Sequence, residues 1–141
     1  MDAVRDERGQ AVLLAVFLIA IAAVVIVGLH LQQDRAFALE RSRRAGEAAA
    51  EAATTAVADA YTAALGEAIV TKRAMDIGRV IGSDATRLAA RAAAAEASAV
   101  NGGGAIDDVG LRCADNRVEV VVTISGASYR AGFPAGECSR R

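Results

Sequence analysis

The chain has few of the side chains that carry catalysis or line deep apolar pockets. Its 141 residues include no Trp, one His, one Pro, two Cys, three Phe and two Tyr. The single histidine, His30, follows a long apolar run, so we expect neither a Ser-His-Asp triad nor a zinc site completed by the two cysteines. The composition therefore predicts a protein that is not an enzyme, with no cofactor, no metal and no small-molecule substrate.

The charges are balanced and dispersed along the chain. It has 16 Lys and Arg and 17 Asp and Glu, which give a net charge of -1 at pH 7. A nucleic-acid-binding protein usually gathers its basic residues into a patch or a stripe. We therefore expect no nucleic-acid partner.

The chain is rich in large apolar residues only in one run near its N-terminus. From Ala11 to Leu29 it contains no charge, no amide and no proline. A helix over this run is about 28 Å long, just under the ~30 Å hydrocarbon core of a bilayer. We expect residues 1–10 to form a short charged tail and residues 11–31 to form a transmembrane helix.

A cleaved secretory signal is the alternative interpretation of this run. Both Ala20–Ala22 and Ala36–Ala38 have the small-x-small form that signal peptidase accepts. The apolar core of a signal is usually about 7–15 residues long, and the second site lies beyond the polar segment Gln32–Arg35. A retained anchor is therefore preferred, and a secreted soluble binding module freed of its first 38 residues is the alternative.

Residues 32–100 favour an alanine-rich helical region with a break near residues 82–83. Alanine favours helix but buries little area. Glu40 and Arg44 stand in the acid-before-base order that stabilises a helix surface. A row of alanines at three- and four-residue steps is a packing seam for a partner helix, an ordinary intramolecular contact or plain alanine enrichment. This row consists of Ala45, Ala49, Ala52, Ala56, Ala60 and Ala63.

Residues 101–141 are predicted to form a glycine linker and a small β subdomain. The glycines of Asn101–Gly104 end the helical region, and Arg117–Ser125 alternates apolar and polar residues with the period of a strand. A strand at Val109–Cys113, joined to it by the turn residues Ala114–Asn116, completes a hairpin, which needs a helix, a disulfide or a third strand around Tyr129 to be stable. Residues 131–138 are expected to be irregular.

Two pairs of residues in this subdomain could carry chemistry. Cys113 and Cys138 are predicted to form one disulfide if the region faces an oxidising compartment. Asp107 and Asp108 are adjacent, with no nucleophile or base beside them in the sequence, so we interpret them as solvated turn residues.

Two segments together point to a family. They are "DERGQAVLLAVFLIAIAAVVIVGLHL", which contains Arg8–Ala11, and "RSRRAGEAAAEAATTAVADA" after it, with Arg44, Ala45, Ala48, Ala49 and Ala52. They resemble the bacterial TadE/TadG-like proteins of tight-adherence (Flp) pilus assembly. Those proteins begin with a charged tail, Arg-Gly-Gln/Asn-Ala and an apolar helix, followed by an Ala-Asp-Ala-rich helix.

The resemblance implies a pilin-like fold, mainly α with a small β part. A transmembrane helix continues into a long Ala-rich helix, followed by a second helix and a C-terminal β-hairpin or small sheet. The implied function is that of a membrane-anchored, pseudopilin-like structural component or assembly factor of a Tad/Flp-type pilus or related secretion apparatus. The implied partners are the membrane and other pilin-like or pilus-assembly proteins, contacted through helix packing.

The resemblance also implies a processing site and an orientation. Prepilin peptidase would cut between Gly9 and Gln10, but Leu14 stands where TadE-type pseudopilins usually have Glu, so we expect inefficient cleavage or none. The family layout places the C-terminal domain outside the cytoplasm of a single-pass cell-membrane protein. The positive-inside rule favours the reverse, because four arginines follow the apolar run and two precede it.

Overall fold

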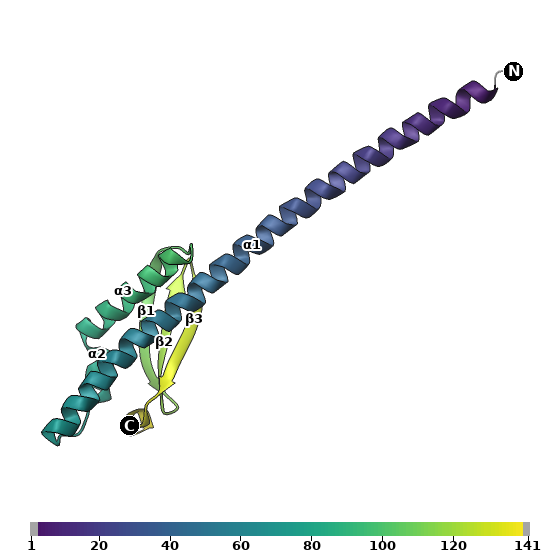
Figure 1. The fold of residues 1–141 in the computed structure, drawn as a ribbon. Coiled ribbons are helices and arrows are strands. Elements are labelled where there is room, and N and C mark those ends of the chain that lie inside the picture. The colour runs from purple at the N-terminus through teal and green to yellow at the C-terminus, as the bar shows by residue number, and fades with distance from the viewer. Residues whose placement is uncertain (1–2, 140–141) are drawn as a thin grey trace. The chain divides into compact units, whose positions relative to one another are not determined.

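The computed structural model describes residues 3–139, with side chains described for residues 12–30 and 32–138. The elements in chain order are α1 (Ala3–Thr71), α2 (Ile77–Gly82), α3 (Asp84–Val100), β1 (Ile106–Ala114), β2 (Arg117–Ile124), β3 (Ala127–Pro134) and the 3-10 helix η1 (Gly136–Ser139) (Figure 1). The predicted fold class, mainly helical with a small C-terminal sheet, is confirmed.

The chain divides into two compact units, and α1 contributes to both. Unit 1 is Met1–Leu39 and unit 2 is Glu40–Arg141. Where the structure describes it, unit 1 consists of the N-terminal part of α1. Its residues favour helix because Ala and Leu are frequent and proline is absent, which leaves the backbone ladder of the helix uninterrupted.

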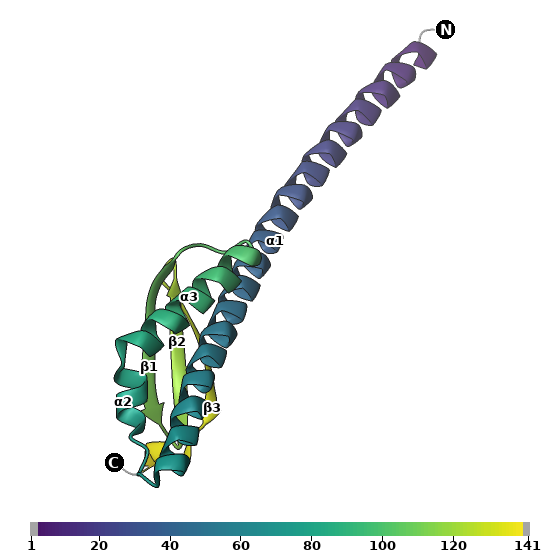
Figure 2. The same cartoon turned by 60° about the vertical axis from the view of Figure 1, so that its left-hand side comes forward.

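Unit 2 places helices on one face of an antiparallel sheet. The strand order is β1-β2-β3. In the central strand, Val120 pairs with Leu111 of β1 on one side and with Ala131 of β3 on the other. The C-terminal part of α1 and the whole of α3 cover the same face of the sheet (Figure 2).

The core of unit 2 lies between β2 and two alanine-rich helices. Val118, Val120 and Val122 are fully buried, and they alternate with less buried residues, which confirms the predicted strand period. Small side chains on the helices let the helix backbones approach the sheet closely. Fully buried helical residues include Ala45, Ala49, Ala53, Val57, Ala90, Ala94 and Ser98.

Both outer strands are longer than the sequence indicated. Asp107 and Asp108, which we interpreted as turn residues, lie within β1, and the Asp107 carboxylate accepts a hydrogen bond from the Gly126 N–H at 3.1 Å. β3 extends to Pro134, so the first half of the segment expected to be irregular is strand. Pro134 is the last residue of an edge strand, where a missing N–H is tolerated.

The helical region breaks twice after α1. The predicted break near residues 82–83 is confirmed, because the Ser83 hydroxyl caps α3 by accepting a hydrogen bond from the Thr86 N–H at 3.1 Å. An earlier break at residues 72–76 was not predicted. There Lys72 adopts a φ of 55°, and α2 begins after the cap Asp76, which brings Ile77 into the core at 5% exposure.

Candidate functional site: the apolar stretch of α1 and its surroundings

The apolar stretch of α1, Val12–Leu29, exposes its large side chains. The exposed fraction of these residues ranges from 45% at Ile21 to 73% at Val24. Every described residue from Val12 to Leu39 is exposed. A contiguous apolar surface of this kind differs from the scattered apolar residues of soluble monomers and marks a membrane or protein contact.

The length of this stretch suits a bilayer. Within the described residues, α1 is long and apolar enough to cross a membrane by length and composition. In a helix all backbone N–H and C=O groups of the span are satisfied internally, as the hydrocarbon requires. The polar residues come directly after it: His30 is exposed at its C-terminal end, and Gln32–Arg35 follow.

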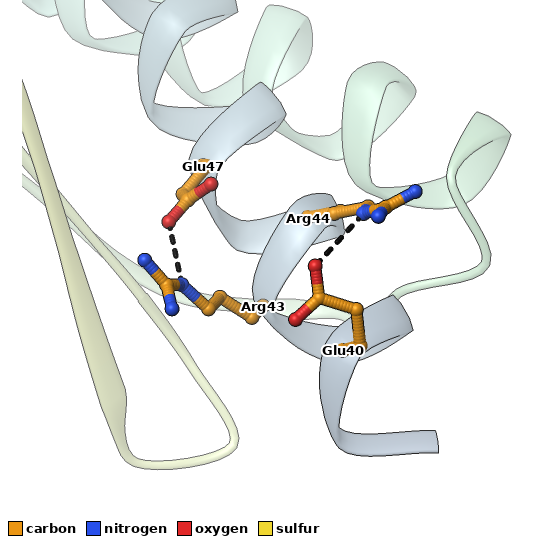
Figure 3. A network of polar contacts seen from close by, with 4 residues as sticks. All are labelled: Glu40, Arg43, Arg44 and Glu47. Carbon is orange, nitrogen blue, oxygen red and sulfur yellow. Dashed lines mark hydrogen bonds and ion pairs between the residues drawn. The ribbon is translucent and has the colours of Figure 1, made fainter. Parts of the chain in front are cut away.

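Two ion pairs occupy the surface of α1 at the start of unit 2 (Figure 3). Arg44 Nε lies 3.0 Å from Glu40 Oε1, and Arg43 Nε lies 2.8 Å from Glu47 Oε1. The first pair confirms the predicted surface interaction. Because all four side chains are more than half exposed, each pair stabilises the helix by only about 0.3–0.5 kcal/mol.

The predicted alanine seam is only partly buried by the chain itself. Ala45 and Ala49 are fully buried within unit 2, so the intramolecular contact that we considered accounts for them. The buried face then continues along Ala53 and Val57, one step away from the predicted row. The other predicted members are Ala52, Ala56 and Ala60, which are half-buried, and Ala63, which is exposed. Their contact with a partner helix stays a prediction.

Several contacts tie the C-terminal segment to the rest of unit 2. Cys113 of β1 and Cys138 of η1 form the predicted disulfide, with their Cα atoms 5.2 Å apart. The Tyr61 hydroxyl donates a hydrogen bond to Glu137 Oε2 at 2.7 Å, and this bond, followed by burial, raises the pKa of Tyr61. The Tyr61 and Phe133 rings also pack with centroids 5.4 Å apart.

Sequence reasoning missed Tyr61, although a signal was present. Tyr61 lies four residues after Val57, and Val57 is in helical step with the buried alanines Ala53, Ala49 and Ala45. The two large residues therefore mark the buried face of α1 among alanines that are otherwise alike.

The remaining predicted positions are not brought together into a reactive centre. Among the residues that the structure describes, no group of three or more His, Cys, Asp or Glu is placed to hold a metal ion. Gly9 and Gln10, the predicted processing site, lie in the first turns of α1, where side chains are outside the described residues.

No family model, no curated protein and no solved structure matches this chain. The resemblance to TadE-like proteins therefore rests on Arg8–Ala11, the apolar run and the alanine-rich helix after it. It stays a prediction, and it enters the argument below as such.

Proposed function

We propose that this chain is a membrane-anchored, pseudopilin-like subunit of a Tad/Flp-type pilus or of a related secretion apparatus. The observation that carries the proposal is the exposed apolar stretch Val12–Leu29 on a helix whose later turns form part of a folded domain. A bilayer covers such a stretch at no cost in hydrogen bonding. The family resemblance supplies the pilus component of the proposal.

In this proposal the function is structural and depends on packing between subunits. Phe37 and Leu39 are 67% and 73% exposed and follow the polar segment that ends at Arg35. Large apolar side chains beyond the bilayer favour a protein neighbour. Helices of other pilin-like subunits or assembly proteins would cover them, together with the half-buried alanines Ala52 and Ala56.

The C-terminal domain is proposed to lie outside the cytoplasm, with the protein crossing the cell membrane once and entering a surface pilus. The disulfide between Cys113 and Cys138 supports this orientation, because disulfides persist in oxidising compartments. The four arginines after the apolar run oppose it. The family layout and the disulfide agree, so we favour the outside.

One specific observation favours a second candidate, a secreted binding module. Unit 2 begins at Glu40, and only Leu39 stands between it and the small-x-small site Ala36–Ala38. Cleavage there would release the whole of unit 2 without the apolar stretch. Carbonate-resistant retention of the full-length chain in membranes supports the anchor, and quantitative recovery of a shortened soluble protein would support the secreted module.

A matched pair of double variants tests the anchor. Ile19 and Ile69 are both 69% exposed on α1, and Val24 and Val70 are 73% and 83% exposed. Arginine near the centre of a span opposes insertion by about 2.5–3.5 kcal/mol per residue. I19R/V24R should therefore lose carbonate-resistant retention, whereas I69R/V70R should be retained like the wild type. Equal retention of the two variants would contradict the anchor.

The pilus component is tested in the source bacterium. Deletion of the gene should abolish surface pili, and the wild-type chain and I69R/V70R should restore them whereas I19R/V24R should not. A neighbouring secretion ATPase and Tad-type inner-membrane proteins would support the assignment. Unchanged pili in the deletion strain would overturn it.

Processing is a separate prediction. Because Leu14 replaces the usual Glu, we expect the mature protein to keep its N-terminus or to be cut inefficiently after Gly9. Intact-mass measurement of the membrane-extracted protein decides this. A uniform N-terminus at Gln10 would show that Leu14 does not impede the peptidase.

A further inference from the structure

β1 is an edge strand of the sheet in unit 2, and its open edge is little protected. Edge strands usually carry proline, lysine or a covering element that prevents pairing with another chain. The opposite edge strand, β3, ends in Pro134. β1 contains neither proline nor lysine, its irregularity in register lies at its start between Ile106 and Asp108, and its central residue is Gly110.

The middle of β1 is self-complementary when it is read against itself in the antiparallel direction. Asp108–Arg112 has the sequence Asp-Val-Gly-Leu-Arg. A two-fold axis at Gly110 places Asp108 of each copy opposite Arg112 of the other, and Val109 opposite Leu111. Opposite charges and apolar pairs directly across two strands stabilise the pairing, and glycine at the axis removes any clash between side chains.

The side chains are distributed correctly for this arrangement. Asp108, Gly110 and Arg112 pair with Thr123, Val121 and Glu119 of β2, on the face of the sheet away from the helices. Asp108 and Arg112 are both exposed. Among the described residues Asp108 has no ion-pair or hydrogen-bond partner through its side chain, whereas Arg112 already contacts Glu119.

The helix-covered side of the same edge offers further contact area. An open groove between α3 and β1 is lined by Leu88, Val109 and Leu111, with charged residues at its rim. Leu88 is 68% exposed. Five paired residues alone bury less than the roughly 1,200–2,000 Å² of a stable interface, so the Leu88 face of α3 would have to join the contact.

The start of β1 is capped and sets a limit to the pairing. Arg91 Nη2 of α3 donates a hydrogen bond to the Ile106 carbonyl at 2.9 Å. Because the guanidinium already bonds to this carbonyl, it competes with a further strand for the hydrogen bond at that end of β1. The open part of the edge is therefore the self-complementary segment Asp108–Arg112.

We propose that unit 2 pairs with a second copy of this chain through β1, in an antiparallel two-fold arrangement centred on Gly110. The two sheets then form one continuous sheet across the interface. The inference concerns unit 2 and does not depend on the membrane anchor or on the pilus assignment.

A charge-swap experiment tests both the partner and the register. Full-length chains carrying Gly110→Cys are purified in detergent with two different tags and oxidised mildly. The site has room, because an added Cβ at Gly110 would lie no closer than 3.9 Å to its nearest neighbour, the Val121 carbonyl. A disulfide that joins two differently tagged chains shows that the introduced thiols at position 110 of two copies meet at the axis. Peptide mapping confirms that the bond is formed by these thiols.

D108R and R112D are each introduced into the Gly110→Cys chain. In a pair of identical variant chains, each substitution places like charges opposite each other at both 108–112 positions. Each variant alone should cross-link about tenfold less than the parent. A mixture of D108R and R112D restores both opposite-charge pairs, so cross-linking between the two variants should return to the parental level. Recovery in the mixture distinguishes pairing from damage to the fold.

The matched controls lie on the opposite edge. Arg130 of β3 is the other arginine near Glu119, with its Nη1 atom 3.7 Å from Glu119 Oε1. R130D removes this arginine but should leave cross-linking unchanged. Ser128→Cys in place of Gly110→Cys should give no cross-link. The proposal is overturned if the Gly110→Cys parent cross-links no more than the Ser128→Cys control, if D108R cross-links like the parent, or if the mixture fails although both variants keep trypsin-resistant domains.

Discussion

The two stretches of α1 show opposite relations between side-chain size and burial. In unit 1 the large apolar residues are exposed, as Ile19 is at 69%. In unit 2 small residues are buried, and Ala49 and Ala53 are fully covered by the domain. The backbone is helical in both stretches, so secondary structure does not distinguish them.

This difference shows that the burial of a residue in α1 depends on whether another part of the domain packs against it, and not on the size of its side chain. A flat alanine surface lets the sheet of unit 2 approach closely, and Val57 is the only larger side chain of α1 that is fully buried there among the described residues. The large side chains described in unit 1 are exposed and suit hydrocarbon instead. Substitutions that are neutral in one stretch should therefore be costly in the other.

Removing the disulfide should give the largest change, confined to unit 2. The Cys113–Cys138 bond joins residues 25 positions apart, and closing a loop of this size stabilises a domain by about 3–4 kcal/mol. C138S should lower the free energy of unfolding of unit 2 by that amount and make it protease-sensitive, while membrane retention is unchanged. C113S should behave identically, since it removes the same bond.

The same cysteines test the orientation. Thiol labelling of freshly isolated, alkylation-quenched wild-type protein should find no free cysteine. If both thiols label in cells only after permeabilisation, the domain is cytoplasmic and the proposed orientation is wrong.

Enlarging an alanine should have the second-largest effect on stability, and only in the stretch of α1 that belongs to unit 2. A53L inserts a bulky side chain between α1 and the sheet, and overpacking of this kind destabilises by about 2–3 kcal/mol. A22L adds the same atoms to an exposed position of unit 1 and should leave unit 2 unchanged. Urea unfolding of the full-length chain in detergent, followed by protease resistance of unit 2, measures both. Equal midpoints for the two variants would contradict the comparison.

Y61F should have a smaller effect, with a characteristic pH dependence. It removes the hydrogen bond to Glu137, which is worth about 1–2 kcal/mol. Because that bond raises the pKa of Tyr61, its contribution is fully present below the ordinary tyrosine value of about 10 and is lost as the pH rises past the raised pKa. The stability difference between wild type and Y61F should therefore be constant from neutral pH to about 9 and shrink above about 10.

The smallest expected effect lies at the start of unit 2. R44A removes the exposed ion pair with Glu40 and should cost about 0.3–0.5 kcal/mol. Salt screens such pairs, so the difference in melting temperature between R44A and wild type should vanish near 1 M NaCl. A loss that persists at high salt would mean that Arg44 contributes packing as well as charge.

Features with a strong local signal were predictable from the sequence. The apolar run, the alternation of β2 and the break near residues 82–83 each follow from a short stretch of residues, and the structure contains all three. The cysteine pair was predictable because both cysteines lie in the same small subdomain.

Features that depend on tertiary contacts were not predictable. Alanine occupies several faces of α1, so the spacing of the alanines alone could not locate the buried face, which Val57 and Tyr61 mark. Pro134 suggested irregular structure, but its place at the end of an edge strand depends on the strand order. The unpredicted break at residues 72–76 allows Ile77 to reach a core that is completed by the strands.

The hydrogen bond between Tyr61 and Glu137 joins residues 76 positions apart in the sequence. During synthesis, the alanine face of α1 therefore emerges long before the strands that cover it. Contacts of such long range form late, whereas a helix forms within about a microsecond. For an anchored chain this sets an order of maturation: the apolar stretch partitions into the bilayer first, the sheet then closes on α1, and the bond between Cys113 and Cys138 forms only after Cys138 has been made.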